Sequence, residues 1–182
     1  IGTNRQNAFD DYIAAARWLV ANGYTTTDQL VSRGNSNGGI LVAVTALQAP
    51  DAFRAVFCRA PTLDMIRFTR FENMRTATVE FGSPDDPVEG AYLAAYSPYH
   101  NIKPGTKYPA TLITTADTDD RVVPMHSFKY AAALQAAQAG DAPILIRIET
   151  RAGHGAGTPI TKRIDQAADK WAFLWKALGM SH

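Results

Sequence analysis

Cysteine is almost absent from this sequence, with Cys58 the only one among 182 residues. A single thiol excludes an internal disulfide and any metal centre built from a cysteine cluster. Cys58 lies in the apolar run 55–58, so we expect it to be buried and unreactive. An excess of one charge is lacking too, because 18 Lys and Arg nearly balance 17 Asp and Glu. The net charge of +1 gives no reason to expect nucleic acid or an anionic membrane as a partner.

Long hydrophobic runs are missing as well. No stretch approaches the roughly 18 apolar residues that cross a bilayer, and we expect no membrane partner, no metal and no cofactor. The 46% hydrophobic and 19% charged residues are typical of a globular protein, and the length suits one domain. The chain starts at Ile1 with neither an initiator methionine nor a signal peptide. We therefore expect part of a longer protein, cytoplasmic or alternatively periplasmic.

Apolar periodicity and breaking residues predict that helices and strands alternate along the chain. This order indicates an α/β fold with a parallel sheet and right-handed crossovers. We expect Asn7 or Asp10 to cap the first helix and the apolar last strand to lie buried in the sheet. The expected helices cover about 7–22, 37–48, 88–95, 125–139 and 160–178, and the strands 29–33, 53–58, 108–115 and 143–148. The residues expected to face inward from the last helix are Ile164, Ala168, Trp171, Leu174, Trp175 and Leu178.

Residues 34–39 stand between a predicted strand and a predicted apolar helix. Their G-x-S-x-G pattern in that context is typical of the nucleophile elbow of α/β-hydrolases. We expect the turn to be so tight that the positions flanking Ser36 must have no Cβ, which Gly34 and Gly38 provide. The hydroxyl of Ser36 would lie over the N-terminus of the helix, where free N–H groups and the helix dipole favour a developing negative charge. The same residues would also suit a plain turn.

A serine nucleophile needs a base and an acidic group that orients this base, in the chain order Ser, Asp or Glu, His. Here Ser36 is followed by the acidic loop 117–120 and then by His154 between two glycines. Each follows a predicted strand, which places them at the edge of the sheet where ligands bind. The alternative for His154 is a plain turn residue. His100 follows no strand, His126 begins a helix where a positive charge is disfavoured, and His182 is terminal. The pattern does not choose between Asp117, Asp119 and Asp120.

The sequence resembles the prolyl oligopeptidases, serine peptidases with an α/β-hydrolase catalytic domain. The matching stretches are 34–39, 119–129 and 152–157, with further likeness at 7–11 and 96–101, and the resemblance covers essentially the whole chain.

This resemblance implies Ser36 as nucleophile, Asp119 as orienting acid and His154 as base. The backbone N–H of Asn37 would be one oxyanion donor, and Arg121 would hold a carbonyl of the substrate, the alternative for Arg121 being a salt bridge to a neighbouring Asp. It therefore implies hydrolysis of oligopeptides through an acyl-enzyme.

The substrate pocket departs from the family pattern. The position of the family's tryptophan, whose ring stacks on the substrate proline, matches Ala77. Phe81, Val122 and Thr62 would still line the pocket. Losing such a ring costs about 1 kcal/mol or more, so we expect a weaker preference for proline and room for larger side chains. An esterase or acyl hydrolase on the same fold is the alternative.

The resemblance also implies that residues 1–182 are the C-terminal part of the catalytic domain, with only the later strands of its sheet. The first half of the domain, a tyrosine hydroxyl that completes the oxyanion hole, and a β-propeller would belong to the upstream portion of the same protein. One flank of the sheet would then be an open hydrophobic edge. The non-enzymatic alternative is an inactive half-domain that serves as a structural or partner-binding piece.

Overall fold

The computed structural model describes residues 2–155 and 157–181, and its centre is a parallel sheet of four strands in the order β1-β2-β3-β4. The predicted α/β fold with a parallel sheet is confirmed. Each strand ends at the same edge, since Asn35 pairs with Arg59 and Ala116 with Glu149. The strands are β1 (Val31–Asn35), β2 (Ala55–Arg59), β3 (Ala110–Ala116) and β4 (Ile144–Glu149).

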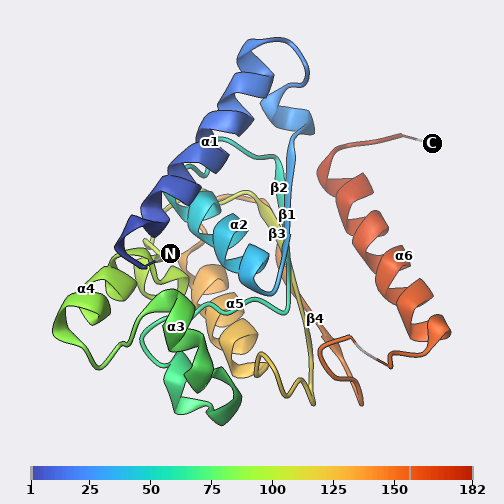
Figure 1. Cartoon of the computed structure of the whole chain (residues 1–182). Coiled ribbons are helices and arrows are strands. Elements are labelled where there is room, and N and C mark those ends of the chain that lie inside the picture. The colour runs from blue at the N-terminus through green and yellow to red at the C-terminus, as the bar shows by residue number, and fades with distance from the viewer. Residues whose placement is uncertain (1, 156, 182) are drawn as a thin grey trace.

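Helices cover both faces of the sheet unequally. Figure 1 shows α6 alone on one side and the other helices on the opposite side. Short 3-10 turns, α3 and α4 lie in the segment between β2 and β3. The helices are α1 (Arg5–Ala21), α2 (Asn37–Gln48), α3 (Thr78–Phe81), α4 (Pro87–Tyr96), α5 (Met125–Ala137) and α6 (Ile160–Ala177).

The core forms in three clusters that follow these layers. The largest joins α1, α2 and α5 to one face of the sheet, with Val42, Ile113 and Leu134 buried at its centre. On the other face, Phe173 and Leu174 of α6 pack on β2 and β3. The third cluster lies under the segment between β2 and β3. Each fully buried side chain of this size contributes about 1.5–3 kcal/mol, so the clusters fix where the loops leave the sheet.

The predicted cap of the first helix is wrong. A 3-10 turn at Gly2–Asn4 leads directly into α1, which begins at Arg5 with Asn4 at the capping position and no side-chain cap bond. Asn7 and Asp10 therefore lie inside the helix. Asp10 accepts a hydrogen bond from the Gln6 side chain at 2.9 Å, one helical turn earlier.

The predicted inward face of the last helix is only partly right. Leu174 is buried, but Ile164 and Trp171 are 60% and 63% exposed. The sheet contacts the neighbouring stripe of Phe173, Leu174 and Ala177 instead. The remaining residues of the expected face are Ala168 and Trp175, which are exposed, and Leu178, which is half-buried.

The last strand also differs from the prediction. β4 lies at an edge of the sheet, so Leu145 and Ile148 stay exposed. An uninterrupted apolar run therefore did not distinguish an edge strand from a central one.

Within the described part of the chain, no helix is long and apolar enough to cross a membrane. The same residues hold no group of three or more His, Cys, Asp or Glu side chains placed to share a metal ion.

Candidate active site

The loops that follow β1, β3 and β4 meet at the carboxyl edge of the sheet, and they carry Ser36, Asp119 and His154. The segment with α3 lies at the same end of the molecule, at the bottom of Figure 1. Parallel strands produce this meeting, because their carboxyl ends share one edge.

Ser36 occupies a strained turn between β1 and α2. Its backbone has φ 54° and ψ −118°, a region that side-chain-bearing residues seldom adopt. Two backbone hydrogen bonds hold it, from its own N–H to the carbonyl of Arg59 at 2.8 Å and from the Gly39 N–H to its carbonyl at 2.9 Å. Although Ser36 is at the capping position of α2, its side chain makes no cap bond. The hydroxyl is thus not used to cap the helix.

The glycines that this turn requires differ from the predicted pair. A Cβ at Gly34 would lie 2.0 Å from the carbonyl oxygen of Gly38, so Gly34 is needed as expected. A Cβ at Gly38 would meet nothing within 4 Å, which makes that half of the prediction wrong. Gly39 is the second tight position, where a Cβ would lie 2.6 Å from that of Pro61. The sterically required glycines are therefore Gly34, against the turn itself, and Gly39, against the chain after β2.

The structure joins His154 to Asp119. Nδ1 of His154 lies 2.7 Å from Oδ2 of Asp119, whose residue is 3% exposed. The other carboxylate oxygen accepts the backbone N–H groups of Arg121 at 3.0 Å and Val122 at 2.9 Å. Both oxygens thus have fixed partners. Among the described residues no hydrogen bond joins His154 to Ser36, and such bonds are often long before a substrate binds.

The other two aspartates of this loop occupy different places. Asp117 accepts the backbone N–H of Ala152 at 3.3 Å. The backbone N–H of Arg151 lowers the pKa of the Asp117 carboxyl. Asp117 thus holds the start of the loop that carries His154. Asp120 lines the cavity described below.

The other histidines have structural contacts. His126 is buried, and its Nδ1 accepts the backbone N–H of Asp64 at 3.1 Å. Burial lowers the pKa of His126 to about 4. His100 lies between Ser97 and Arg67, at 2.8 and 3.1 Å from its two ring nitrogens. His182 falls outside the described residues.

A cavity of about 420 Å³ opens beside Ser36. It brings together all the residues that the resemblance had assigned to substrate binding. Sequence reasoning missed four others: Met74, Thr76, Glu80 and Asp120. The predicted substrate-binding residues in its lining are Thr62, Ala77, Phe81, Arg121 and Val122, and Asn37, predicted as an oxyanion donor, lines it too.

Arg5 of α1 braces one wall of this cavity, and no sequence signal pointed to it. Its guanidinium lies 4.6 Å from the centre of the Phe81 ring and 3.3 Å from Glu80 Oε1, and it bonds the side chain of Asn37. Asn37 in turn donates to Glu80 at 2.6 Å. The partners are 32 to 76 positions away in the chain, so a local pattern does not reveal them.

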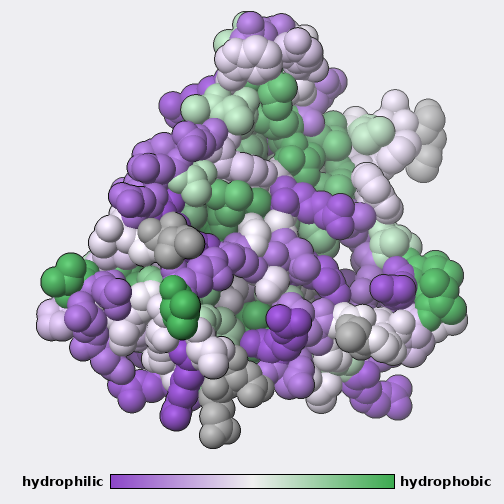
Figure 2. Space-filling model, viewed as in Figure 1, coloured by the Kyte–Doolittle hydropathy of each residue, from purple (hydrophilic) through white to green (hydrophobic). Residues whose placement is uncertain are grey.

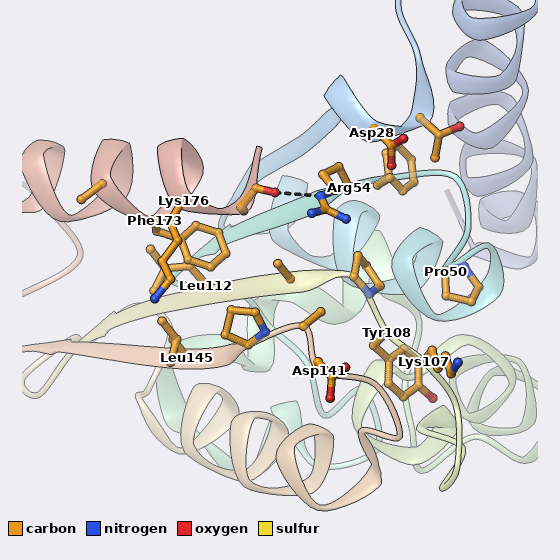
Figure 3. A pocket seen from close by; sticks show the side chains of 18 of the residues that line it. Asp28, Pro50, Arg54, Lys107, Tyr108, Leu112, Asp141, Leu145, Phe173 and Lys176 are labelled. Atoms are coloured by element: carbon orange, nitrogen blue, oxygen red, sulfur yellow. Dashed lines mark hydrogen bonds between the residues drawn. The ribbon is translucent and has the colours of Figure 1, made fainter. Parts of the chain in front are cut away.

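A larger cavity, about 960 Å³, lies at the opposite edge of the sheet, between α6 and the amino ends of the strands. Figure 3 shows apolar walls from Leu112, Leu145 and Phe173, and Arg54 donating to a carbonyl at the end of α6, that of Ala177 at 2.7 Å. Among the residues that the structure describes, its lining includes no serine, cysteine or histidine. Volume alone therefore does not mark the chemical site, and the cavity beside Ser36 is the better candidate.

Comparisons with known proteins agree with this geometry. The chain is 45% identical to a prolyl endopeptidase of Elizabethkingia miricola over 184 residues, which is all of this chain and 26% of that protein. It is 41% identical to prolyl oligopeptidase A of Amanita bisporigera, over 100% of the chain and 24% of the relative. The chain thus spans about a quarter of the length of these relatives.

Solved structures show the same likeness. Prolyl oligopeptidase B of Galerina marginata, bound to a 35mer hydrolysis and macrocyclization substrate, superposes with a TM-score of 0.94 at 40% identity. The match covers 99% of this chain and 25% of that one. The sequence profile of the prolyl oligopeptidase family matches residues 1–181. This chain belongs to the prolyl oligopeptidase family.

Proposed function

We propose that this chain carries the catalytic residues of a serine-type peptidase that cleaves oligopeptides through an acyl-enzyme. The observation that carries the proposal is the 2.7 Å bond between His154 Nδ1 and Asp119 Oδ2, at the same sheet edge as the strained Ser36. Membership of the family and relatives named prolyl endopeptidase support it.

The proposed reaction has two steps, acylation of Ser36 and hydrolysis of the acyl-enzyme, and His154 and Asp119 act in both. Nδ1 of His154 faces Asp119, so Nε2 accepts the proton of Ser36 as Oγ bonds to the scissile carbonyl carbon. The C–N bond then breaks, and the same proton passes to the leaving amine. Water then gives a proton to His154 and attacks the acyl carbonyl carbon, and the ester bond to Ser36 breaks as the proton returns to Oγ. The carboxylic acid product is released. The N–H of Asn37, the first residue of α2, stabilises the oxyanion, aided by the helix N-terminus.

The cavity beside Ser36 is proposed to bind the side chain that precedes the cleaved bond. Phe81 and Val122 are buried apolar residues of its wall, and Arg121 at its rim would hold a substrate carbonyl with its fork of donors. Ala77 offers no ring to stack on a proline. A preference for proline is thus proposed to be weak, and larger side chains are proposed to fit.

Placing a tryptophan at position 77 is expected to sharpen the preference for proline. In the full-length protein, Ala77→Trp should raise the ratio of kcat/KM for a proline substrate over a leucine substrate by roughly 3- to 10-fold, the effect of one aromatic contact. The matched control is Val79→Trp, since Val79 is 88% exposed and outside the cavity lining. An unchanged ratio in Ala77→Trp would contradict this role for position 77. The same assays with simple acyl esters test the alternative, because ester turnover without peptide cleavage indicates an esterase.

We further propose that residues 1–182 are the C-terminal part of the catalytic domain, and that the upstream portion of the same protein, with the first half of the domain and a β-propeller, covers its open surfaces. Figure 2 shows apolar surface between α1 and α6, along the β1 flank of the sheet. On α6, Ile160, Ile164 and Trp171 lie at spacings of 4 and 7 residues and are each at least 60% exposed. An exposed stripe of this kind is typical of an interface. The fourfold greater length of the relatives supports this occupant.

The isolated 182-residue chain is expected to turn over at least ~10²-fold more slowly than the full-length protein, because the second oxyanion donor is proposed to lie upstream. We also expect it to self-associate through its apolar flank in light scattering. Co-expression with the upstream portion should restore a soluble complex and its turnover. An isolated chain that is monomeric and fully active would contradict the division. A full-length protein without activity would instead favour the inactive half-domain.

We propose a cytoplasmic location for the full-length protein, with the periplasm as the alternative. Recovery of the full-length protein from the periplasmic fraction would contradict it.

A further inference from the structure

Arg59, the last residue of β2, contacts both halves of the candidate active site. Its backbone carbonyl accepts the N–H of Ser36 at 2.8 Å. Its side chain reaches over the edge of the sheet, where Nη2 donates to the backbone carbonyl of His154 at 3.3 Å. Nη1 donates to the Asn35 side chain at 3.2 Å, immediately before the nucleophile.

We propose that Arg59 is a positioning residue that sets the distance between the nucleophile turn and the loop of the base. This rests on the proposed function of Ser36 and His154. Asp119 fixes one ring nitrogen of His154, but a ring held at one atom still moves with its backbone. The bond from Arg59 to the His154 carbonyl restrains that backbone relative to the turn of Ser36.

The backbone at Gly155 packs closely against the guanidinium of Arg59. A Cβ at Gly155 would lie 2.6 Å from Nη2 of Arg59, closer than real contacts allow. Gly155 also has φ +128°, which side chains rarely permit. The loop of His154 therefore lies directly against the guanidinium, and a side chain at residue 155 would have to displace that guanidinium.

The fork of arginine suits this role better than a lysine. Asn35 is the last residue of β1 and His154 lies in the loop after β4, so the two acceptors belong to segments far apart in the chain. A planar guanidinium donates to both from fixed directions, whereas an ammonium on a flexible stem is a single point of charge. Replacement by lysine should consequently preserve part of the function but not all of it.

The test uses variants of the full-length protein with a peptide substrate. Arg59→Met keeps the apolar stem and removes the fork, and it is expected to lower kcat about tenfold with KM within about twofold, the loss of one or two positioning bonds. Arg59→Lys should recover part of that loss. The matched control is Arg163→Met, an exposed arginine on α6, which should leave kcat unchanged.

Gly155→Ala supplies an independent readout, because it displaces the same guanidinium. We expect the double variant with Arg59→Met to lose less than the product of the two single losses, since methionine ends short of the Nη2 position. The proposal is overturned if the two single losses of kcat multiply in the double variant. It is also overturned if Arg59→Lys and Arg59→Met lose the same kcat and both have a lowered unfolding midpoint, because that pattern shows a purely structural role. If Ser36→Ala keeps full activity, the proposed function itself fails. If Ser36→Ala is inactive while Arg59→Met has normal kcat, only the positioning role fails.

Discussion

Ser36→Ala in the full-length protein is expected to lower kcat by about 10⁵-fold or more, the scale found when a nucleophile of a serine hydrolase is removed. The reason is that the hydroxyl forms the covalent bond, and its strained turn presents no second nucleophile in its place. A residual rate above that of water should remain, since the oxyanion donors and the cavity are untouched. Steady-state kinetics with a peptide substrate measure the loss.

Because Ser36 and His154 act in one step, their effects should not multiply. His154→Ala is expected to cost about as much as Ser36→Ala, and the double variant should be no slower than either single variant. A fluorophosphonate probe should label Ser36 in the unaltered protein and nothing in Ser36→Ala. Labelling at another residue, or a double variant that is slower by the product of both losses, would contradict the proposed triad.

Asp119→Asn is expected to lower kcat on the order of 10⁴-fold while the protein stays folded. The cause follows from the contacts of the carboxylate. Its Oδ1 accepts two backbone N–H groups, from Arg121 and Val122, so an asparagine must keep its oxygen there. The new NH₂ group then faces Nδ1 of His154 and forces the proton onto Nε2. In that tautomer the ring has no lone pair free to take the proton of Ser36.

The neighbouring aspartates test whether this effect is specific. Asp117→Asn and Asp120→Asn are expected to lose less than about tenfold, because neither carboxylate bonds the ring of His154. Asp117 holds the backbone at Ala152, so some loss is expected there. The pH dependence of kcat/KM should keep its shape in both. If Asp120→Asn were as slow as Asp119→Asn, the assignment of the orienting acid would be wrong.

The sequence was informative where local chemistry decides structure. Alternating apolar runs predicted all four strands and the five longer helices, and α2 has the bounds that were expected. The elbow, the acidic loop and His154 were found because each must follow a strand. The choice of Asp119 as the orienting acid required the family resemblance and stays a prediction, for which the bond to His154 supplies a physical reason.

The remaining features depend on contacts between distant segments. Gly39 is required because Pro61 packs against it, and Arg5 contacts Glu80 75 positions away. The periodicity of α6 predicted an apolar stripe that included Trp171, but it did not show which face of the helix packs against the sheet. These three features depend on which distant segments meet in the folded chain. They therefore cannot be predicted from local patterns in a single sequence.

The lone thiol gains a practical meaning from its place in the sheet. Cys58 is fully buried in β2, its Sγ lies 3.9 Å from the carbonyl of Gly39 under the nucleophile turn, and burial raises its pKa to about 12. A thiol at that depth is protonated and shielded, and it reacts with an alkylating reagent only when β2 and α2 separate. The rate at which Cys58 is alkylated therefore measures how often the sheet opens beneath the turn of Ser36.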